Sequence, residues 1–289
     1  MSAALVEQAP AKINLTLRVL GRRGDGYHEL ESLVAFADIA DTLALQPANE
    51  TVLDIAGPFA AASGPVADNL VLKAATALRQ RVNGLKAGHF RLQKNIPVAG
   101  GLGGGSADAA AALRLLARVN DLPSGDARLA AAALAVGADV PVCLESRPRV
   151  MRGVGERLAP PVELPQLAAV LVNPGVPLST RDVFAAFAVT PGKTENISPV
   201  PRAAVGLFDY LKVNGNDLTA AAIARAPVVA EVLRTLSGLP GARFAAMSGS
   251  GPTCFALFAS PAEAAAAARR VQSENKQWWV QGASIGGQP

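Results

Sequence analysis

The chain has 289 residues, half of them hydrophobic and only 4% aromatic, so one large or two medium domains must pack chiefly through Ala, Val and Leu. Its formal net charge of +4 comes from dispersed Lys and Arg that do not cluster with aromatic residues, which excludes a nucleic-acid surface and weakly favours an anionic small molecule. The two cysteines and two histidines lie at no metal-ligand spacing, which excludes a Cys/His metal site.

Neither a membrane span nor an export signal is expected. The long uncharged stretch 244–262 is interrupted by glycine and proline, which makes it a poor membrane helix. Residues 1–8 carry Glu7 and lack both a basic start and a long apolar core. A soluble, cytoplasmic protein is therefore expected, with Cys143 and Cys254 as reduced core thiols.

Residues 11–20 alternate between apolar and polar side chains, which predicts a strand with one buried face and one polar face. The polar face carries Lys12 and Asn14 side by side. Further elements predicted in the first part of the chain are a turn at 21–26, strands at 33–39, 42–45 and 89–96, and a helix at 68–81 that Gly84 follows.

A glycine-rich segment at 97–106 lies between the strand at 89–96 and an alanine-rich helix expected at 107–119. Bare backbone amides at a helix start bind phosphate, so a phosphate loop is favoured over a flexible linker, which would not sit tightly between a strand and a helix. No lysine follows the glycines, and the third glycine of the dinucleotide fingerprint falls on Ser106 or Asp108. The loop therefore belongs to neither familiar class.

The remaining pattern alternates helices and strands without an internal repeat, which is typical of an α+β protein. Gly137 is expected to end a helix at 126–136, and proline density rises near residue 160. Strands are predicted at 167–173, 242–247, 254–258 and near 278, helices at 216–225, 227–236 and 261–272, a polar loop at 191–201, and a second glycine loop at 248–252.

Six segments resemble, in order, the motifs of the GHMP kinase superfamily, and the resemblance runs from residue 10 to about residue 258. They are residues 10–15, 24–30, the glycine loop, 137–141, 153–156 and 248–251. The resemblance implies an α+β two-domain fold, with a ribosomal-protein-S5-like N-terminal domain at 1–158, an α/β sandwich at 159–289, and the active site in the cleft between them. It also implies an ATP-dependent phosphotransferase with an alcohol acceptor.

The resemblance places ATP, together with Mg²⁺, on the glycine loop. Ser106 at the helix start would contact the metal or a phosphate, and no other protein ligand for the metal is assigned. Many relatives extend the glycine run where this chain has Ala99, which suits the loop if Ala99 does not take a positive φ. The residues expected to contact ATP are Pro97, Val98, Ala99, Gly100, Gly101, Leu102, Gly103, Gly104, Gly105, Ser106 and Ala107.

Lys12 and Asp139 are the catalytic candidates that the resemblance implies. Asp139 would take the proton of the acceptor hydroxyl or mainly orient that hydroxyl, and Lys12 would neutralise charge on the transferring phosphoryl group. From the residues alone, Asp139 reads as a turn or cap residue and Lys12 as a solvated lysine on a strand edge. Asp108, one turn into the helix, is expected only to complement the helix dipole.

Tyr27 and His28 follow a tight turn, and the resemblance places them at a cytosine ring, with Asn14 and Thr180 also on the substrate. Phe184 is the candidate for the opposite wall of the ring, although Asp182 aligns there as plausibly. Without the resemblance, a half-buried tyrosine and a surface histidine are equally expected.

The lysine-asparagine strand together with Gly-Tyr-His favours the member of the family whose substrate carries a cytidine diphosphate on methylerythritol. A hydroxyl of that methylerythritol would be phosphorylated to the 2-phosphate, a step of non-mevalonate isoprenoid synthesis. A homoserine or mevalonate-type kinase, or a binding protein without turnover, remain the alternatives. The expected partner is this small molecule, with no nucleic acid and no membrane, and the chain is expected as a monomer or weak homodimer.

Overall fold

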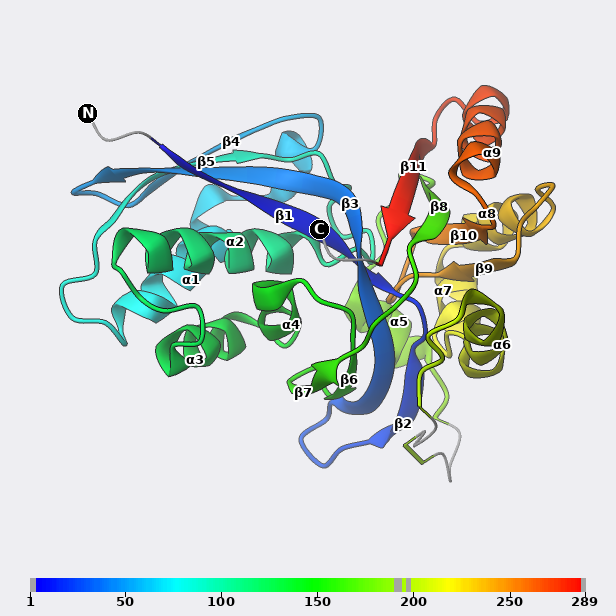
Figure 1. The fold of residues 1–289 in the computed structure, drawn as a ribbon, viewed down its shortest axis with the longest axis horizontal. Helices are drawn as coiled ribbons and strands as arrows, with labels where there is room; N and C mark the ends of the chain where they lie inside the picture. The colour runs from blue at the N-terminus through cyan, green and yellow to red at the C-terminus, as the bar shows by residue number, and fades with distance from the viewer. Residues whose placement is uncertain (1–3, 190–193, 196–198, 287–289) are drawn as a thin grey trace. The chain divides into compact units, whose positions relative to one another are not determined.

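The computed structural model describes residues 4–189, 194–195 and 199–286, and it divides the chain into two compact units (Figure 1). Unit 1 contains the chain through Lys12, Ile39–Val98 and Gly103–Ser146. Unit 2 contains Ile13–Asp38, Ala99–Leu102 and the chain from Arg147 onward. The α+β fold class is confirmed, and no helix in the described part of the chain is long and apolar enough to cross a membrane.

Unit 1 is a small sheet with a group of packed helices. Strand β5 (Ala87–Gln93) pairs antiparallel with the second half of β3 (His28–Ala48) and parallel with β4 (Val52–Ala56), while β1 (Leu5–Asn14) also pairs with β3. The helices are α1 (Leu70–Arg79), α2 (Gly104–Val119), α3 (Ala127–Val136) and α4 (Val140–Glu145), preceded by 3₁₀ turns at Ala60–Ser63 and Val66–Asp68.

Helix α2 is the central helix of unit 1, since it packs against α1, α3 and α4 (Figure 1). Its residues from Ala107 to Leu113 are all buried, so this stretch of the helix has no solvent-exposed face. Alanine has the highest helix propensity and lets neighbouring helices approach closely, which explains the alanine-rich sequence here. The phosphate-loop candidate therefore leads into a rigidly packed helix.

Unit 2 is built on an antiparallel sheet in the order β3-β11-β8-β10-β9. These strands are β8 (Leu167–Asn173), β9 (Phe244–Met247), β10 (Cys254–Phe258) and β11 (Trp279–Ile285). The first half of β3 pairs with β2 (Arg18–Arg22) and β6 (Arg149–Gly153), and β6 pairs with β7 (Arg157–Pro161). The helices are α5 (Thr180–Ala186), α6 (Ala204–Asn214), α7 (Thr219–Arg225), α8 (Val228–Ser237) and α9 (Pro261–Glu274).

Local sequence patterns predicted most of these elements. The strands at 167–173 and 254–258 are confirmed at the residue, Gly137 ends α3 as predicted, and the turn before Tyr27 is present. The helix predicted from residue 107 begins three residues earlier at Gly104, and α6 was not predicted. The predicted loop at 191–201 lies partly outside the described residues.

The prediction of one continuous strand at 11–20 was wrong. Strand β1 ends at Asn14 and β2 begins at Arg18, while the two strands predicted at 33–39 and 42–45 form one strand, β3. The polar side chains of Lys12, Asn14 and Thr16 are 3 to 5% exposed, so both faces of this segment are covered. Alternating polarity reveals which residues share a face, but other elements decide whether the polar face meets solvent.

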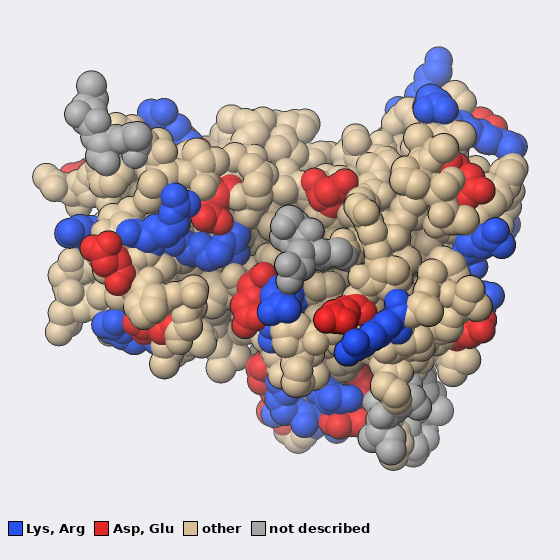
Figure 2. Space-filling view, viewed as in Figure 1, with Lys and Arg blue, Asp and Glu red and all other residues tan. Residues whose placement is uncertain are grey.

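Charged side chains on the face shown in Figure 2 are mixed in sign. Figure 2 shows Lys and Arg interspersed with Asp and Glu on the face that it displays. This agrees with the dispersed charge read from the sequence and offers no single-sign patch on that face for nucleic acid.

Candidate active site

The glycine loop has the backbone of an anion-binding loop. Gly101, with φ +76°, and Gly103, with φ +60°, take left-handed conformations that favour glycine. The amides of Gly104 and the next two residues open α2 and have no earlier helical carbonyl to bind, while Ala107 N–H donates to Gly103 O at 2.9 Å. These amides, with the positive end of the helix dipole, form the kind of site that binds phosphate.

The expectation for Ala99 was wrong. Its φ is +52°, in the left-handed region that favours glycine, and not at the negative φ expected for alanine. An alanine in that region costs about 1 to 2 kcal/mol relative to its usual conformations. The loop tolerates this strain because the residues that follow it are held by a second loop.

The second glycine loop, residues 248–252, supports the first one within unit 2. Ser248 Oγ donates to Gly101 O at 2.8 Å and accepts from Asn14 N–H at 3.1 Å, and Thr253 N–H donates to Gly100 O at 3.2 Å. A Cβ atom on Gly101 would overlap the carbonyl oxygen of Ser248. The two loops therefore require glycine where their backbones meet, and the sequence offered no signal for this pairing.

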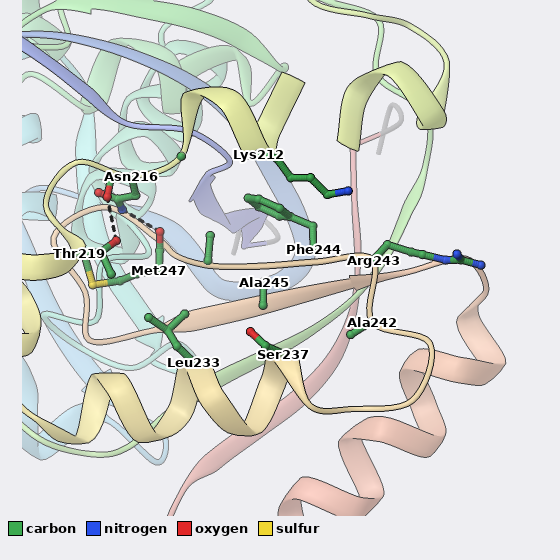
Figure 3. Close-up of a pocket in the computed structure, with 12 residues that line it drawn as sticks. Lys212, Asn216, Thr219, Leu233, Ser237, Ala242, Arg243, Phe244, Ala245 and Met247 are labelled. Atoms are coloured by element: carbon green, nitrogen blue, oxygen red, sulfur yellow. Dashed lines mark hydrogen bonds between the residues drawn. The ribbon is translucent and has the colours of Figure 1, made fainter. Parts of the chain in front are cut away.

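Asn216 holds the start of the second glycine loop through hydrogen bonds to its backbone (Figure 3). Its Nδ2 donates to Met247 O at 2.7 Å and to Gly249 O at 2.8 Å, and its Oδ1 accepts from Leu218 N–H at 3.0 Å. Figure 3 shows Asn216 at one end of a cavity of about 450 Å³ beside β9. None of the predicted site residues lines that cavity.

Lys12 and Asp139 form an ion pair within unit 1. Lys12 Nζ lies 3.1 Å from Asp139 Oδ2, with the lysine side chain 4% exposed and the aspartate side chain 40% exposed. Asp139 stands at the N-cap position of α4 but makes no capping hydrogen bond, and Lys12 is not a solvated lysine. A carboxylate open to solvent beside a buried ammonium suits a group that accepts a proton from an incoming ligand.

The phosphate loop ends against this ion pair. A Cβ atom on Gly103 would lie 3.1 Å from both Cβ and Cε of Lys12, so the Lys12 side chain would have to shift by a few tenths of an ångström. Glycine at 103 therefore lets the backbone at the start of α2 lie directly on the Lys12 side chain. The loop amides and the Lys12–Asp139 pair are neighbours in unit 1.

A second charged cluster lies buried in unit 1. Lys94 Nζ donates to carboxylate oxygens of Asp41 and Asp108, the latter at 2.8 Å. Burial raises the pKa of Asp108 to about 7, against the opposing effect of Lys94. Burial lowers the pKa of Lys94, but both carboxylates together raise it on balance. Asp108 therefore contacts Lys94 in the interior, and the prediction that it only complements the helix dipole was wrong.

Four of the predicted substrate residues line one cavity of about 900 Å³ in unit 2, namely Tyr27, His28, Thr180 and Phe184. The rings of His28 and Phe184 are stacked, with centroids 5.0 Å apart and planes inclined by 30°. Burial, and then the charge of Arg22, lower the pKa of His28, so the ring is neutral at pH 7. A neutral imidazole beside an aromatic wall can hydrogen-bond and stack a flat heterocycle.

Several residues that line this cavity were not predicted, among them Phe187 and Arg22, and one predicted substrate residue, Asn14, lies outside it. Phe187 packs edge-on to His28 at 6.4 Å, and it lies three residues after Phe184, a helical spacing that could have revealed it. Arg22 also lines the cavity. Asn14 does not line it: its Nδ2 donates to Ser32 Oγ at 2.7 Å, and the residue is 5% exposed.

Among the described residues, no group of three or more His, Cys, Asp or Glu side chains is arranged to hold a metal ion. Mg²⁺ needs no such cage, because it keeps several waters and binds mainly through nucleotide phosphates plus one or two protein oxygens. The half-buried Ser106 in the first turn of α2 offers one such oxygen. Ser106 and the start of α2 therefore suit a Mg²⁺ ion that binds together with a nucleotide.

Comparisons with known proteins agree with this geometry. The family model for the N-terminal domain of GHMP kinases matches residues 69–147, and the model for their C-terminal domain matches residues 204–277. Proteins named 4-diphosphocytidyl-2-C-methyl-D-erythritol kinase are similar over nearly their full length. The one from Rhodopseudomonas palustris (strain HaA2) is 51% identical, covering 98% of this chain and 99% of its own. The one from Bradyrhizobium diazoefficiens is 52% identical, covering 98% of each.

Solved structures show the same relationship. A crystal structure of 4-(cytidine 5'-diphospho)-2C-methyl-D-erythritol kinase has a TM-score of 0.76 and 34% identity, and the match covers 98% of this chain and 100% of that one. Homoserine kinase from Cytophaga hutchinsonii has a TM-score of 0.73 at 18% identity, covering 99% of this chain and 95% of that one, which shows a shared fold.

Proposed function

The chain belongs to the GHMP kinase family and, within it, to the 4-diphosphocytidyl-2-C-methyl-D-erythritol kinases, and from that premise we propose how its own residues bind and position the two substrates. It is an ATP-dependent phosphotransferase with an alcohol acceptor. The product is the 2-phosphate of the cytidyl compound, an intermediate of the non-mevalonate isoprenoid pathway.

ATP binds through the loop at 97–107. The left-handed glycines expose backbone amides, and the start of α2 adds the helix dipole, so the triphosphate is held by fixed donors that need no rearrangement. Ser106 Oγ would contact a Mg²⁺ ion bound with the nucleotide, and that ion would neutralise charge on the phosphates.

Lys12 and Asp139 serve the transferring group and the acceptor. Asp139 accepts the proton of the substrate hydroxyl as that oxygen bonds to the γ-phosphorus and the bond to the β-phosphate oxygen breaks. Lys12 holds the Asp139 carboxylate at 3.1 Å and places a positive charge beside the end of the phosphate loop. The single observation that carries this assignment is the close approach of Gly103 to the Lys12 side chain.

The cytosine of the substrate occupies the cavity of Tyr27, His28, Thr180 and Phe184. The stacked His28–Phe184 pair supplies one flat wall, and Tyr27, which is 65% exposed and lines the same cavity, would cover the opposite face of the cytosine. Thr180 Oγ1 lies 2.8 Å from Ser250 Oγ, which ties this cavity to the second glycine loop. Asn14 supports the site through Ser248 rather than through contact with the ring.

The finer predictions on organisation are also part of this proposal. The division into two domains at 1–158 and 159–289 is supported by the matched segments 69–147 and 204–277, which lie on either side of that boundary. The compact units differ from it, because Ile13–Asp38 and the chain from Arg147 belong to unit 2. A cytoplasmic monomer or weak homodimer suits a kinase that acts on a diffusible substrate.

A substrate panel tests the proposal. With Mg-ATP, the purified protein should phosphorylate the cytidyl-methylerythritol diphosphate and leave homoserine and mevalonate unmodified. Phosphorylation of homoserine or mevalonate alone would overturn the substrate assignment. Tight binding of ATP and the cytidyl compound without any turnover would instead identify a binding protein that keeps the fold.

A further inference from the structure

Three buried charged side chains in unit 1 have no part in the proposed chemistry. Asp41 comes from β3, Lys94 follows β5, and Asp108 lies in the second turn of α2. They are 0%, 3% and 2% exposed. Charged residues are almost never this buried unless they are paired, so their position between three elements requires an explanation.

The cluster holds the chain on both sides of the glycine loop. Asp41 Oδ1 accepts from the backbone N–H of Asn95 at 2.5 Å and of Ile96 at 2.9 Å, the two residues just before Pro97. Lys94 Nζ donates to Asp41 and also to Asp108 Oδ2 at 2.8 Å, which lies beyond the loop in α2. Asp41 and Lys94 therefore connect the segment before the glycine loop to α2, the helix that follows the loop.

The cluster also lies close to the first residue of α2. A Cβ atom on Gly104 would lie 3.4 Å from Lys94 Nζ and 3.6 Å from Asp41 Oδ2. Movement of the Lys94 ammonium would therefore shift the helix start, where the free amides point. A side chain at this distance acts on the phosphate site without touching a ligand.

We propose that Asp41, Lys94 and Asp108 are positioning residues that hold the two ends of the phosphate loop in register for the ATP triphosphate. The proposal rests on the proposed role of that loop. Buried ion clusters are weak contributors to stability, because apolar residues of similar volume often replace them at no cost. What the cluster supplies instead is a defined geometry, since each hydrogen bond fixes one distance between β3, the loop entry and α2.

The experiment compares Lys94→Met and Asp108→Leu with Asp108→Asn in the full chain. Asp108→Asn keeps an oxygen that accepts from Lys94, so it is the conservative variant. Lys73→Met, on the exposed side of α1 in the same unit, is the matched control for Lys94→Met. The readouts are the KM for ATP, the KM for the cytidyl substrate, kcat, and thermal unfolding.

The expected result is a rise in the KM for ATP without a matching rise in the KM for the cytidyl substrate. Lys94→Met and Asp108→Leu should raise the KM for ATP about 10- to 100-fold, the scale of losing one hydrogen bond to a charged group. The KM for the cytidyl substrate should change less than about twofold, and Asp108→Asn and Lys73→Met should remain close to the parent chain. A purely structural role would lower the unfolding temperature and leave both KM values unchanged in the folded fraction.

Two outcomes overturn the inference. One is an unchanged KM for ATP in Asp108→Leu. This variant retains the Lys94–Asp41 pair, so it can be measured even if Lys94→Met does not fold. The other is an equal rise in both KM values. Failure of the proposed function is distinguished by the parent chain itself, because a parent chain that binds no Mg-ATP shows that the loop is not a nucleotide site.

Discussion

Replacing Asp139 by Asn separates the catalytic role of this carboxylate from its contribution to stability. The ion pair with Lys12 spans 3.1 Å, and at an effective dielectric constant of about 20 its Coulomb energy is about 5 kcal/mol. The Asp139 side chain is 40% exposed, so solvent screens this attraction and the net contribution falls to about 1 kcal/mol. We therefore expect Asp139→Asn to lower the free energy of unfolding by no more than about 1 kcal/mol.

The expected loss of turnover is much larger. Removal of a general base lowers kcat by about 100- to 10,000-fold, which corresponds to about 2.7 to 5.5 kcal/mol in activation free energy. The KM for ATP should change little, because the loop amides that bind the phosphates remain in place.

Steady-state kinetics with the cytidyl substrate, together with urea unfolding, measure both effects. Asp121→Asn, in the exposed turn after α2, is a matched control that removes one carboxylate from the same unit. A kcat for Asp139→Asn within about tenfold of the parent value would refute the role of a proton acceptor and favour one in orienting the hydroxyl. A loss of stability as large as the loss in activation free energy would show that the pair is mainly structural.

Three further outcomes follow from the two glycine loops and the aromatic cavity. Ala99→Gly should raise the free energy of unfolding by about 0.5 to 1 kcal/mol, because glycine relieves the strain of a φ of +52°. A lower free energy of unfolding, measured by urea denaturation, would contradict this. Asn216→Ala should lower the free energy of unfolding by about 2 kcal/mol, because the hydrogen bonds to Met247 O and Gly249 O are lost. An unchanged urea midpoint would count against this prediction. Burial, and then the charge of Arg22, lower the pKa of His28, so its ring is mainly neutral at pH 7 and gains a proton only as the pH falls further. The KM for the cytidyl substrate should therefore be flat above pH 7 and rise only at lower pH; a rise that begins above pH 7 as the pH falls would exclude this role.

Local sequence patterns were sufficient to predict several parts of this protein. The strand at 167–173 is a continuous apolar run, and such runs are typical of a strand covered on both faces. Glycine-rich sequence between a strand and a helix indicated a phosphate loop, because only glycine leaves the amides open and allows the left-handed turns at Gly101 and Gly103. Ordered motifs along the chain identified the kinase family. These features depend on residues that are close in sequence, or on residue types that have few other uses.

Tertiary structure alone decided which polar groups meet. Ser248 Oγ reaches Gly101 O across 147 residues, and Lys94 reaches Asp41 across 53. No periodicity of 2 or 3.6 residues extends over such separations, and Asp108 and Lys12 read as ordinary surface charges until packing buries them. The sequence therefore determined that a phosphate loop and a kinase chemistry exist here. The fold determined the strain at Ala99, the partners of Lys12 and the buried cluster beneath the loop, because a hydrogen bond depends on the distance between atoms in space.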